Sequence, residues 1–265
     1  RDCVIANTTA STLYQVPLLL EKEGLCAVVC RKLGLGSGVP DMTEWQAMVE
    51  KILGAHRRVE IALVGKYTGL HDAYLSVAES LFHAGTACDA KVDIRWVDSE
   101  TLTEENAAQM LAGCGGVLVP GGFGDRGIEG MIAAARYARE NRVPYLGICL
   151  GMQIAVIEFA RHVAGWDDAD STEFTTRTAH PVIDLMPEQV GVTAKGGTMR
   201  LGRYPCVLAE GSRARAAYGT AEVFERHRHR YEFNNQFRTE LEEAGLRLSV
   251  LSLSLIHISE PTRPY

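Results

Sequence analysis

Between residues 59 and 162 the sequence alternates four times between a short apolar run and an amphipathic stretch. The apolar runs are typical of buried strands, and the stretches carry apolar residues at helical spacing. We expect strands at 59–64, 92–97, 116–119 and 143–148, and helices at 72–84, 103–111, 128–141 and 151–162. Such repeats imply an α/β fold with an open, mostly parallel sheet and helices on both faces. Ligands bind such sheets at the carboxyl ends of the strands, so the chemistry should follow each strand.

The flanks of this repeat follow other patterns. Upstream, residues 1–35 hold two apolar runs that are typical of the end of another domain, and 36–58 indicates a linker of one loop and one helix. Downstream, the pattern predicts an antiparallel extension with strands at 181–186, 198–208 and 226–233 and a helix at 236–244. The sequence starts at Arg1 rather than Met, so we expect a fragment.

Composition narrows the function classes. The 265 residues carry a formal net charge of −6, with a pI of about 5.8, which argues against the nucleic-acid backbone as the main partner. No apolar run is long enough to cross a bilayer, and no secretory signal opens the sequence. Seven cysteines are an odd count that argues against a disulfide framework, so we expect a reducing, cytoplasmic location.

Cys26 and Cys30 lie one helical turn apart. A metal site at this pair would need further ligands nearby, and the sequence has none there, so we favour buried packing and expect no metal site.

The segment Gly147-Ile148-Cys149-Leu150-Gly151 lies where a predicted strand meets a predicted helix. It has the G-x-C-x-G pattern of a nucleophile elbow, in which a tight turn lifts one side chain to the top of the sheet. The N-terminus of the following helix would stabilise the thiolate, which is the nucleophilic form of cysteine. The alternative is a buried cysteine between two packing glycines. We interpret Cys149 as a candidate nucleophile.

A glycine-rich segment, Pro120-Gly121-Gly122-Phe123-Gly124, follows the preceding strand. Consecutive glycines let backbone N–H groups face a ligand without obstruction by side chains. Acyl transfer needs donors aimed at the developing oxyanion, and the N–H groups of Gly122 and Leu150 would supply two. The alternative is a glycine-rich turn with no ligand.

Together, segments 120–124 and 147–153 resemble class I glutamine amidotransferase domains, whose fold is flavodoxin-like. A finer set of motifs resembles one family of that class, the CTP synthases, at 65–67, 72–74, 171–174, 196–202 and 225–232. Residues 8–35 are similar to the end of that family's synthetase domain. The resemblance therefore implies the end of a synthetase (amidoligase) domain at 1–35, a linker at 36–58 and an incomplete type 1 glutamine amidotransferase domain at 59–249.

The resemblance also implies residue roles. Cys149 would attack the side-chain amide of glutamine and form a thioester, while Gly122 and Leu150 hold the oxyanion. Glu173 would pair with the α-ammonium and Arg230 with the α-carboxylate of the substrate. The full set of implied glutamine-binding residues is Gly122, Leu150, Gly151, Met152, Gln153, Glu173 and Arg230. Without the resemblance, a solvated loop charge is the favoured interpretation of Glu173. Arg230 belongs to a basic run that is typical of a solvated strand face or a substrate site.

For the parent enzyme, the resemblance implies an ATP-dependent ligase that aminates UTP to CTP. The ammonia would come from L-glutamine, with Mg²⁺ beside ATP, GTP as the allosteric activator and a homotetrameric assembly. We expect no cofactor to bind within this fragment, and neither a nucleic acid nor a membrane as partner.

One part of the family pattern is missing. A cysteine nucleophile needs a general base, which the family provides from a His-Pro-Glu motif. The sequence has a single His-Pro, at His180-Pro181, and Val182 follows it. Because this base is missing, the polypeptide as given should form a thioester slowly and only in part.

Two further segments depart from the family pattern. Residues 250–265 do not resemble the end of the domain, and we expect a non-native tail there. Segment 187–195 is shorter than the lid of many relatives.

Two other functions compete with this interpretation. The first is another class I amidotransferase, such as GMP synthetase or the anthranilate type, against which the motif at 225–232 and the synthetase-like N-terminus argue. The second is a non-catalytic scaffold that only assembles with intact subunits. The missing base favours the scaffold, and the intact elbow at Cys149 disfavours it.

Overall fold

The computed structural model describes residues 3–36, 38–186, 200–252 and 256–261. By its internal contacts the chain divides into two compact units, Arg1–Val59 with Glu79–Val92, and Glu60–Ala78 with Asp93–Tyr265. The division runs through two strands and a helix.

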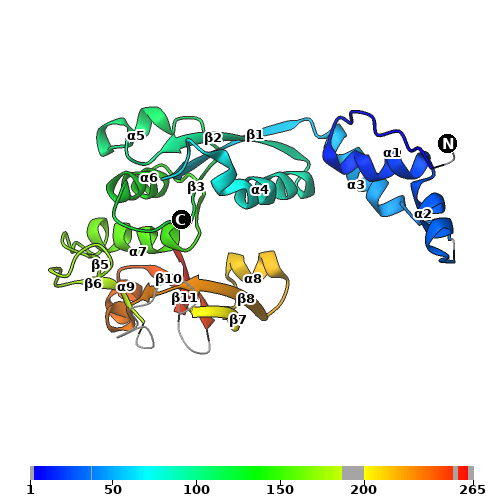
Figure 1. The fold of residues 1–265 in the computed structure, drawn as a ribbon. Coiled ribbons are helices and arrows are strands. Elements are labelled where there is room, and N and C mark those ends of the chain that lie inside the picture. The colour runs from blue at the N-terminus through cyan, green and yellow to red at the C-terminus, as the bar shows by residue number, and fades with distance from the viewer. Residues whose placement is uncertain (1–2, 37, 187–199, 253–255, 262–265) are drawn as a thin grey trace. The chain divides into compact units, whose positions relative to one another are not determined.

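The first unit is mainly helical. It contains η1 (Leu13–Gln15), α1 (Val16–Lys22), α2 (Leu25–Leu33) and α3 (Thr43–Gly54) (Figure 1). Cys26 and Cys30 of α2 have their sulfur atoms 4.0 Å apart. Both residues are only half-buried, so the prediction of buried packing is wrong. The helix is short, and its described residues include no fully buried side chain.

Tyr14 ties the start of this unit to the last turns of α4 (Leu75–Ala87). Its ring stacks on Phe82, with centroids 5.6 Å apart, and its hydroxyl donates to Glu79 over 3.1 Å. The Trp45 Nε1–H donates to the Tyr14 carbonyl over 2.7 Å. Loss of solvation and the Glu79 carboxylate together raise the pKa of Tyr14.

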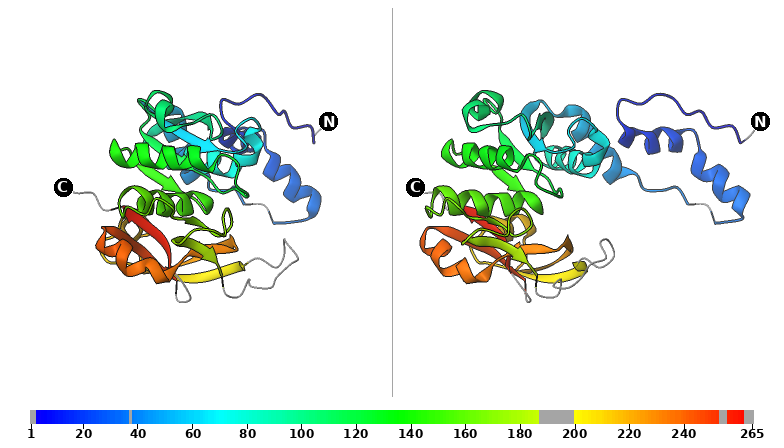
Figure 2. Two further views of the ribbon diagram at one scale, coloured as in Figure 1. Left: turned by 90° about the vertical axis from the view of Figure 1, so that its left-hand side faces the viewer. Right: turned by 60° about the vertical axis from the view of Figure 1, so that its left-hand side comes forward.

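The second unit contains most of a four-stranded sheet with the order β2-β1-β3-β4. The strands are β1 (Arg57–Gly65), β2 (Ala90–Asp98), β3 (Gly116–Val119) and β4 (Tyr145–Gly147), of which the first three are labelled in Figure 1. Figure 2 shows the same ribbon from two further sides. The β1–β3 and β3–β4 pairs are parallel, so the predicted α/β class with a parallel sheet is confirmed. The strand order reverses between β1 and β3, and sheets of this kind usually bind ligands at the carboxyl ends of the strands at such a reversal.

The predicted helix at 72–84 differs at its start. Residues His71–Tyr74 form a 3-10 turn, η2, and the α-helix begins at Leu75. The buried Tyr74 hydroxyl accepts the backbone N–H groups of Lys66 (3.1 Å) and Tyr67 (3.3 Å). These hydrogen bonds fix the turn against the end of β1. Helix propensity is a local property of the sequence and does not include such long-range contacts.

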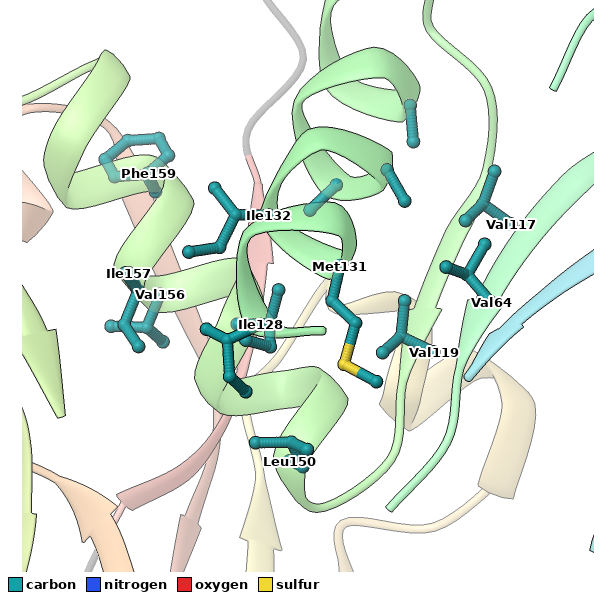
Figure 3. Close-up of a cluster of buried hydrophobic side chains, with 14 of the residues drawn as sticks. Val64, Val117, Val119, Ile128, Met131, Ile132, Leu150, Val156, Ile157 and Phe159 are labelled. Carbon is teal, nitrogen blue, oxygen red and sulfur yellow. The ribbon is translucent and has the colours of Figure 1, made fainter. Parts of the chain in front are cut away.

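The core lies between the sheet and the helices α5 (Glu104–Met110), α6 (Ile128–Glu140) and α7 (Leu150–His162). Figure 3 shows Val117 and Val119 pointing toward Met131 of α6, and Ile132 of the same helix pointing toward α7. Alanines fill much of the buried face of α6, which lets α6 and α7 pack closely. This rigid core positions the loops that follow the strands.

Downstream of α7, two further sheets form. One has the order β5-β6-β9, from β5 (Asp170–Ser171), β6 (Pro181–Leu185) and β9 (Tyr231–Phe233). The other has the order β11-β10-β7-β8, from β7 (Arg200–Leu208), β8 (Glu222–His229), β10 (Leu246–Ser252) and β11 (Ile256–Pro261). The remaining elements are α8 (Arg213–Tyr218), η4 (Asn235–Phe237) and α9 (Arg238–Glu243).

The expected antiparallel extension is present, because β6 pairs antiparallel with β9 and β7 with β8. The strand predicted at 226–233 is two strands, which Arg230 separates. Residues 187–199, with the expected short lid and part of the motif at 196–202, lie outside the described residues, as do 253–255 and 262–265 of the expected tail.

His180 and Asp168 make a surface ion pair before β6. Asp168 accepts from His180 Nδ1 over 2.5 Å and from the Ala179 N–H over 2.6 Å, and these two bonds lower its pKa from 3.8 to about 2. A carboxyl with a lowered pKa stabilises the fold fully above its unfolded pKa and loses that contribution as the pH falls toward 2.

We therefore expect Asp168→Asn to lower the melting temperature by a constant amount between about pH 5 and pH 6, and by less below about pH 4. Melting curves of both proteins from pH 6 to pH 2.5 measure this difference. A difference that grows on acidification would contradict the prediction.

Candidate active site

Cys149 lies at the turn between β4 and α7, as the elbow pattern predicts. It is the N-cap of α7, with a φ of 55° and a ψ of −105°. A positive φ is strained for a residue with a side chain, and such strain is typical of functional turns. The Ile148 N–H donates to the Val119 carbonyl over 2.9 Å and fixes the start of the turn against β3. Cys149 itself is exposed to solvent.

The two glycines of the elbow are required by close backbone approach. A Cβ atom at Gly147 would lie 2.3 Å from the carbonyl oxygen of Gly151. A Cβ atom at Gly151 would lie 2.0 Å from the carbonyl oxygen of Val119. Real Cβ atoms do not approach oxygen this closely, so glycine is the residue that these positions accept.

The glycine-rich loop after β3 lies against the elbow. A Cβ atom at Gly121 would be 3.5 Å from the Cys149 Cβ, and one at Gly122 would be 3.2 Å from Leu150 Cδ2. The two segments that the sequence singled out therefore meet at one edge of the sheet. This brings together the predicted nucleophile and the residues predicted to hold the oxyanion.

Lys66 follows the end of β1, the strand next to β3, and its side chain binds the glycine-rich loop. Its ammonium donates to the Phe123 carbonyl over 3.0 Å and to the Gly124 carbonyl. Only 4% of Lys66 is exposed, and loss of solvation lowers its pKa, although the nearby Glu173 carboxylate acts in the opposite direction. The Lys66 carbonyl in turn accepts from Arg126 Nη2 over 2.9 Å.

Glu173 lies close to the same loop. Its Oε1 accepts the Gly124 N–H over 3.3 Å, and its own N–H donates to the Ser171 hydroxyl over 3.1 Å. Its negative charge acts on both Lys66 and Cys149. Glu173 is half-buried in a turn next to the glycine-rich loop, so its role as a substrate-binding residue stays a prediction.

Three influences act on the pKa of the Cys149 thiol. Although Cys149 is exposed as a residue, the protein around its sulfur reduces the solvation of the thiolate, which raises the pKa. The Leu150 N–H at the N-terminus of α7 lowers the pKa, in the direction that the sequence predicts, and the Glu173 charge raises it. The net shift is upward because the loss of solvation is the largest of the three.

Gln153 is hydrogen-bonded to the backbone of Tyr231, the residue that follows Arg230. The Gln153 Nε2–H donates to the Tyr231 carbonyl over 3.0 Å, while the Gln153 backbone N–H donates to the Cys149 carbonyl over 3.2 Å. Arg230 directly precedes Tyr231, and its carbonyl accepts the Met186 N–H over 2.9 Å. Gly151 is buried and Met152 half-buried in the first turn of α7.

Several residues of this region had no role from sequence alone. Lys66 and Tyr145 are two of them, and the Tyr145 hydroxyl donates to the Gly151 carbonyl over 2.7 Å across the elbow. Lys66 belongs to a motif that supports the family resemblance, which was the available signal. For Tyr145 the sequence offers none, because its contact depends on how the turn closes.

Other chemistry has less support. Within the described parts of the chain, no group of three or more His, Cys, Asp or Glu side chains is arranged to hold a metal ion. Among residues whose side chains are described, no histidine is hydrogen-bonded to the Cys149 sulfur. No helix in the described residues is long and apolar enough to span a membrane.

Comparisons with known proteins show the family of this chain. The family described as "Glutamine amidotransferase class-I" matches residues 70–264. Relatives described as CTP synthase are 58% identical over 249 residues in Chloroflexus aurantiacus and 57% identical over 249 residues in Halalkalibacterium halodurans. These alignments cover 94% of this chain and 46% and 47% of the relatives, so the chain spans about half the length of the curated relatives that it matches.

A solved structure is also similar. It is described as "Trypanosoma brucei CTPS - glutaminase domain with bound acivicin", and it is 42% identical, with a TM-score of 0.69. The match covers 73% of this chain and 75% of that one.

Proposed function

The chain belongs to the class I glutamine amidotransferases, as the glutaminase region of the CTP synthase family, and we propose that Cys149 cleaves the side-chain amide of glutamine. The observation that supports this most is the convergence of three strand ends. The elbow after β4, the glycine-rich loop after β3 and Lys66 after β1 meet at one edge of the sheet, with Glu173 beside them.

In this proposal the Cys149 sulfur bonds to the amide carbon, the C–N bond breaks, and ammonia leaves with the proton of the thiol. The N–H groups of Gly122 and Leu150 stabilise the oxyanion that forms on the way. Water then hydrolyses the thioester, which yields glutamate and restores the thiol.

The amino-acid end of the substrate would bind two charged side chains. Glu173 pairs with the α-ammonium, and the planar guanidinium of Arg230 pairs with the α-carboxylate. Gln153 and the first turn of α7, including Gly151 and Met152, contact the rest of the substrate. The position of Gln153 between Cys149 and Tyr231 supports this arrangement.

The activity of the whole protein is a further proposal, because the chain spans about half of its curated relatives. We propose that the ammonia aminates UTP to CTP in an ATP- and Mg²⁺-dependent reaction that GTP activates, in a cytoplasmic homotetramer. The expected boundaries at 35, 58 and 249 remain predictions. None of the residues discussed above is assigned to UTP, ATP or Mg²⁺.

Turnover by the 265 residues alone should be slow. They contain no His-Pro-Glu motif, and no described histidine is bonded to the thiol. We propose that the first half-reaction, thioester formation, proceeds slowly and that its hydrolysis is slower than in a complete class I domain. A glutaminase assay that gives the rate of a complete domain would contradict this part.

The test of the site is labelling with 6-diazo-5-oxo-L-norleucine, an electrophile with the shape of glutamine, followed by intact mass spectrometry. We expect one adduct per chain, located at Cys149, slowed by excess glutamine or by acivicin and absent in Cys149→Ser. Because the pKa of the thiol is raised, the labelling rate should keep rising through pH 9.

Iodoacetamide provides the control, since it alkylates any exposed thiol. Cys149 that reacts with iodoacetamide but not with the glutamine-shaped reagent would show an accessible thiol without a glutamine site, and it would favour the non-catalytic scaffold. Cys3 and Cys88 are also exposed and report on non-specific reaction in the same sample.

A further inference from the structure

Two histidines of β8 form a chain of hydrogen bonds that ends at the Tyr231 carbonyl, which Gln153 of the candidate site also binds. His227 and His229 lie two residues apart, so their side chains share one face of the strand. His227 Nδ1 is 3.0 Å from His229 Nε2, and His229 Nδ1 is 3.1 Å from the Tyr231 carbonyl oxygen. The same oxygen accepts the Gln153 Nε2–H over 3.0 Å.

The direction of these hydrogen bonds follows from the carbonyl. A carbonyl oxygen only accepts, so His229 Nδ1 carries a hydrogen. In neutral His229 the other nitrogen, Nε2, is then the acceptor, and the hydrogen between the two rings belongs to His227 Nδ1. The Tyr231 carbonyl therefore fixes the tautomer of His229, and His227 complements that tautomer as the donor to His229 Nε2.

The Arg230–Tyr231 segment is consequently held from three elements. The His229 side chain of β8 and Gln153 of α7 both donate to the Tyr231 carbonyl, and Met186, just after β6, donates to the Arg230 carbonyl. Two fixed carbonyl groups on consecutive residues define the backbone from which the Arg230 side chain extends.

We propose that His229 is a positioning residue for the glutamine site. It holds the Tyr231 carbonyl in the place where Gln153 also binds it, and it thereby sets Gln153 and Arg230 for the substrate. This proposal rests on the proposed function, because it takes Gln153 and Arg230 as groups that bind the substrate.

Substitution of His229 by asparagine or by glutamine tests the roles of the two ring nitrogens separately. The Asn Nδ2 atom is attached at Cγ, as is His Nδ1, so His229→Asn keeps a donor for Tyr231. His229→Gln places its amide where Nε2 lies and loses that donor, although it is as polar. The kinetics of labelling by 6-diazo-5-oxo-L-norleucine measure both the half-saturating concentration and the maximal rate.

We expect His229→Gln to raise the half-saturating concentration about tenfold and to leave the maximal rate within about twofold, because it loses one bond that orders the binding groups. His229→Asn should remain within about twofold of the original protein in both. Equal half-saturating concentrations for all three proteins, or equal losses in both variants, would overturn the proposal.

Two further measurements distinguish a loss of folding from a loss of glutamine binding. The iodoacetamide rate at Cys149 shows that the elbow is intact in each variant. The substitutions His227→Asn and His227→Gln repeat the test at the residue that donates to His229. We expect the Gln variant to raise the half-saturating concentration more than the Asn variant does, and both effects to be smaller than at His229. If the original protein is not labelled, the proposed function fails; if it is labelled and the Asn and Gln variants do not differ, only the role of His229 fails.

Discussion

Gly151→Ala is expected to destabilise the second unit by at least about 3 kcal/mol and to remove the labelling of Cys149. In a helix, alanine is ordinarily about 1 kcal/mol more favourable than glycine. Here the added Cβ would lie 2.0 Å from the Val119 carbonyl oxygen and 2.8 Å from its carbonyl carbon. These are backbone atoms of β3, so α7 must move away from the sheet, and overpacking of a rigid core is costly.

The measurement is urea unfolding followed by circular dichroism, together with the labelling assay. Gly69→Ala provides the matched control in the same unit, because a Cβ atom there would meet nothing within 4 Å. We expect that control to change stability by less than about 0.5 kcal/mol and to label normally. Gly151→Ala with the stability and labelling of the control would show that α7 does not approach β3 as described.

The sequence was sufficient to predict the elbow and the loop because both are local. Strand ends, glycine spacing and the start of a helix place Cys149 and Gly122, and a parallel sheet brings the ends of neighbouring strands together. The structure places these two segments in contact, as that reasoning requires. The division of 226–233 at Arg230 was not predicted, since the run has no glycine or proline to interrupt it.

Contacts between distant segments could not be predicted in the same way. The Lys66 ammonium meets a carbonyl 57 positions later, and Gln153 meets one 78 positions later. The pKa of Cys149 depends on such contacts too, because desolvation and the Glu173 charge come from segments that no local pattern describes. Local rules therefore located the groups, whereas their ionisation and their supports required the fold.

Glu158→Gln is expected to destabilise the same unit by about 3 kcal/mol. Glu158 of α7 is only 2% exposed, and it accepts from Arg139 of α6 through Nε (3.0 Å to each oxygen) and Nη2 (2.7 Å). Glutamine keeps the shape but removes the charge and turns an N–H donor toward the guanidinium. Breaking a buried pair costs about 3–5 kcal/mol, and the low end applies because the Arg139 side chain is 25% exposed.

Two controls show whether burial is the cause. Glu242→Gln removes a similar pair with Arg238, at 3.1 Å on the surface, and should change the free energy of unfolding by less than about 0.5 kcal/mol. The double variant Arg139→Met with Glu158→Leu removes both charges and should recover most of the loss, since the cost comes from the cation that has lost its buried carboxylate and keeps only the exposed Glu140, 3.4 Å away. A double variant as unstable as the sum of its single variants would mean that the two side chains do not act as a pair, and that α6 and α7 are held together by their apolar contacts alone.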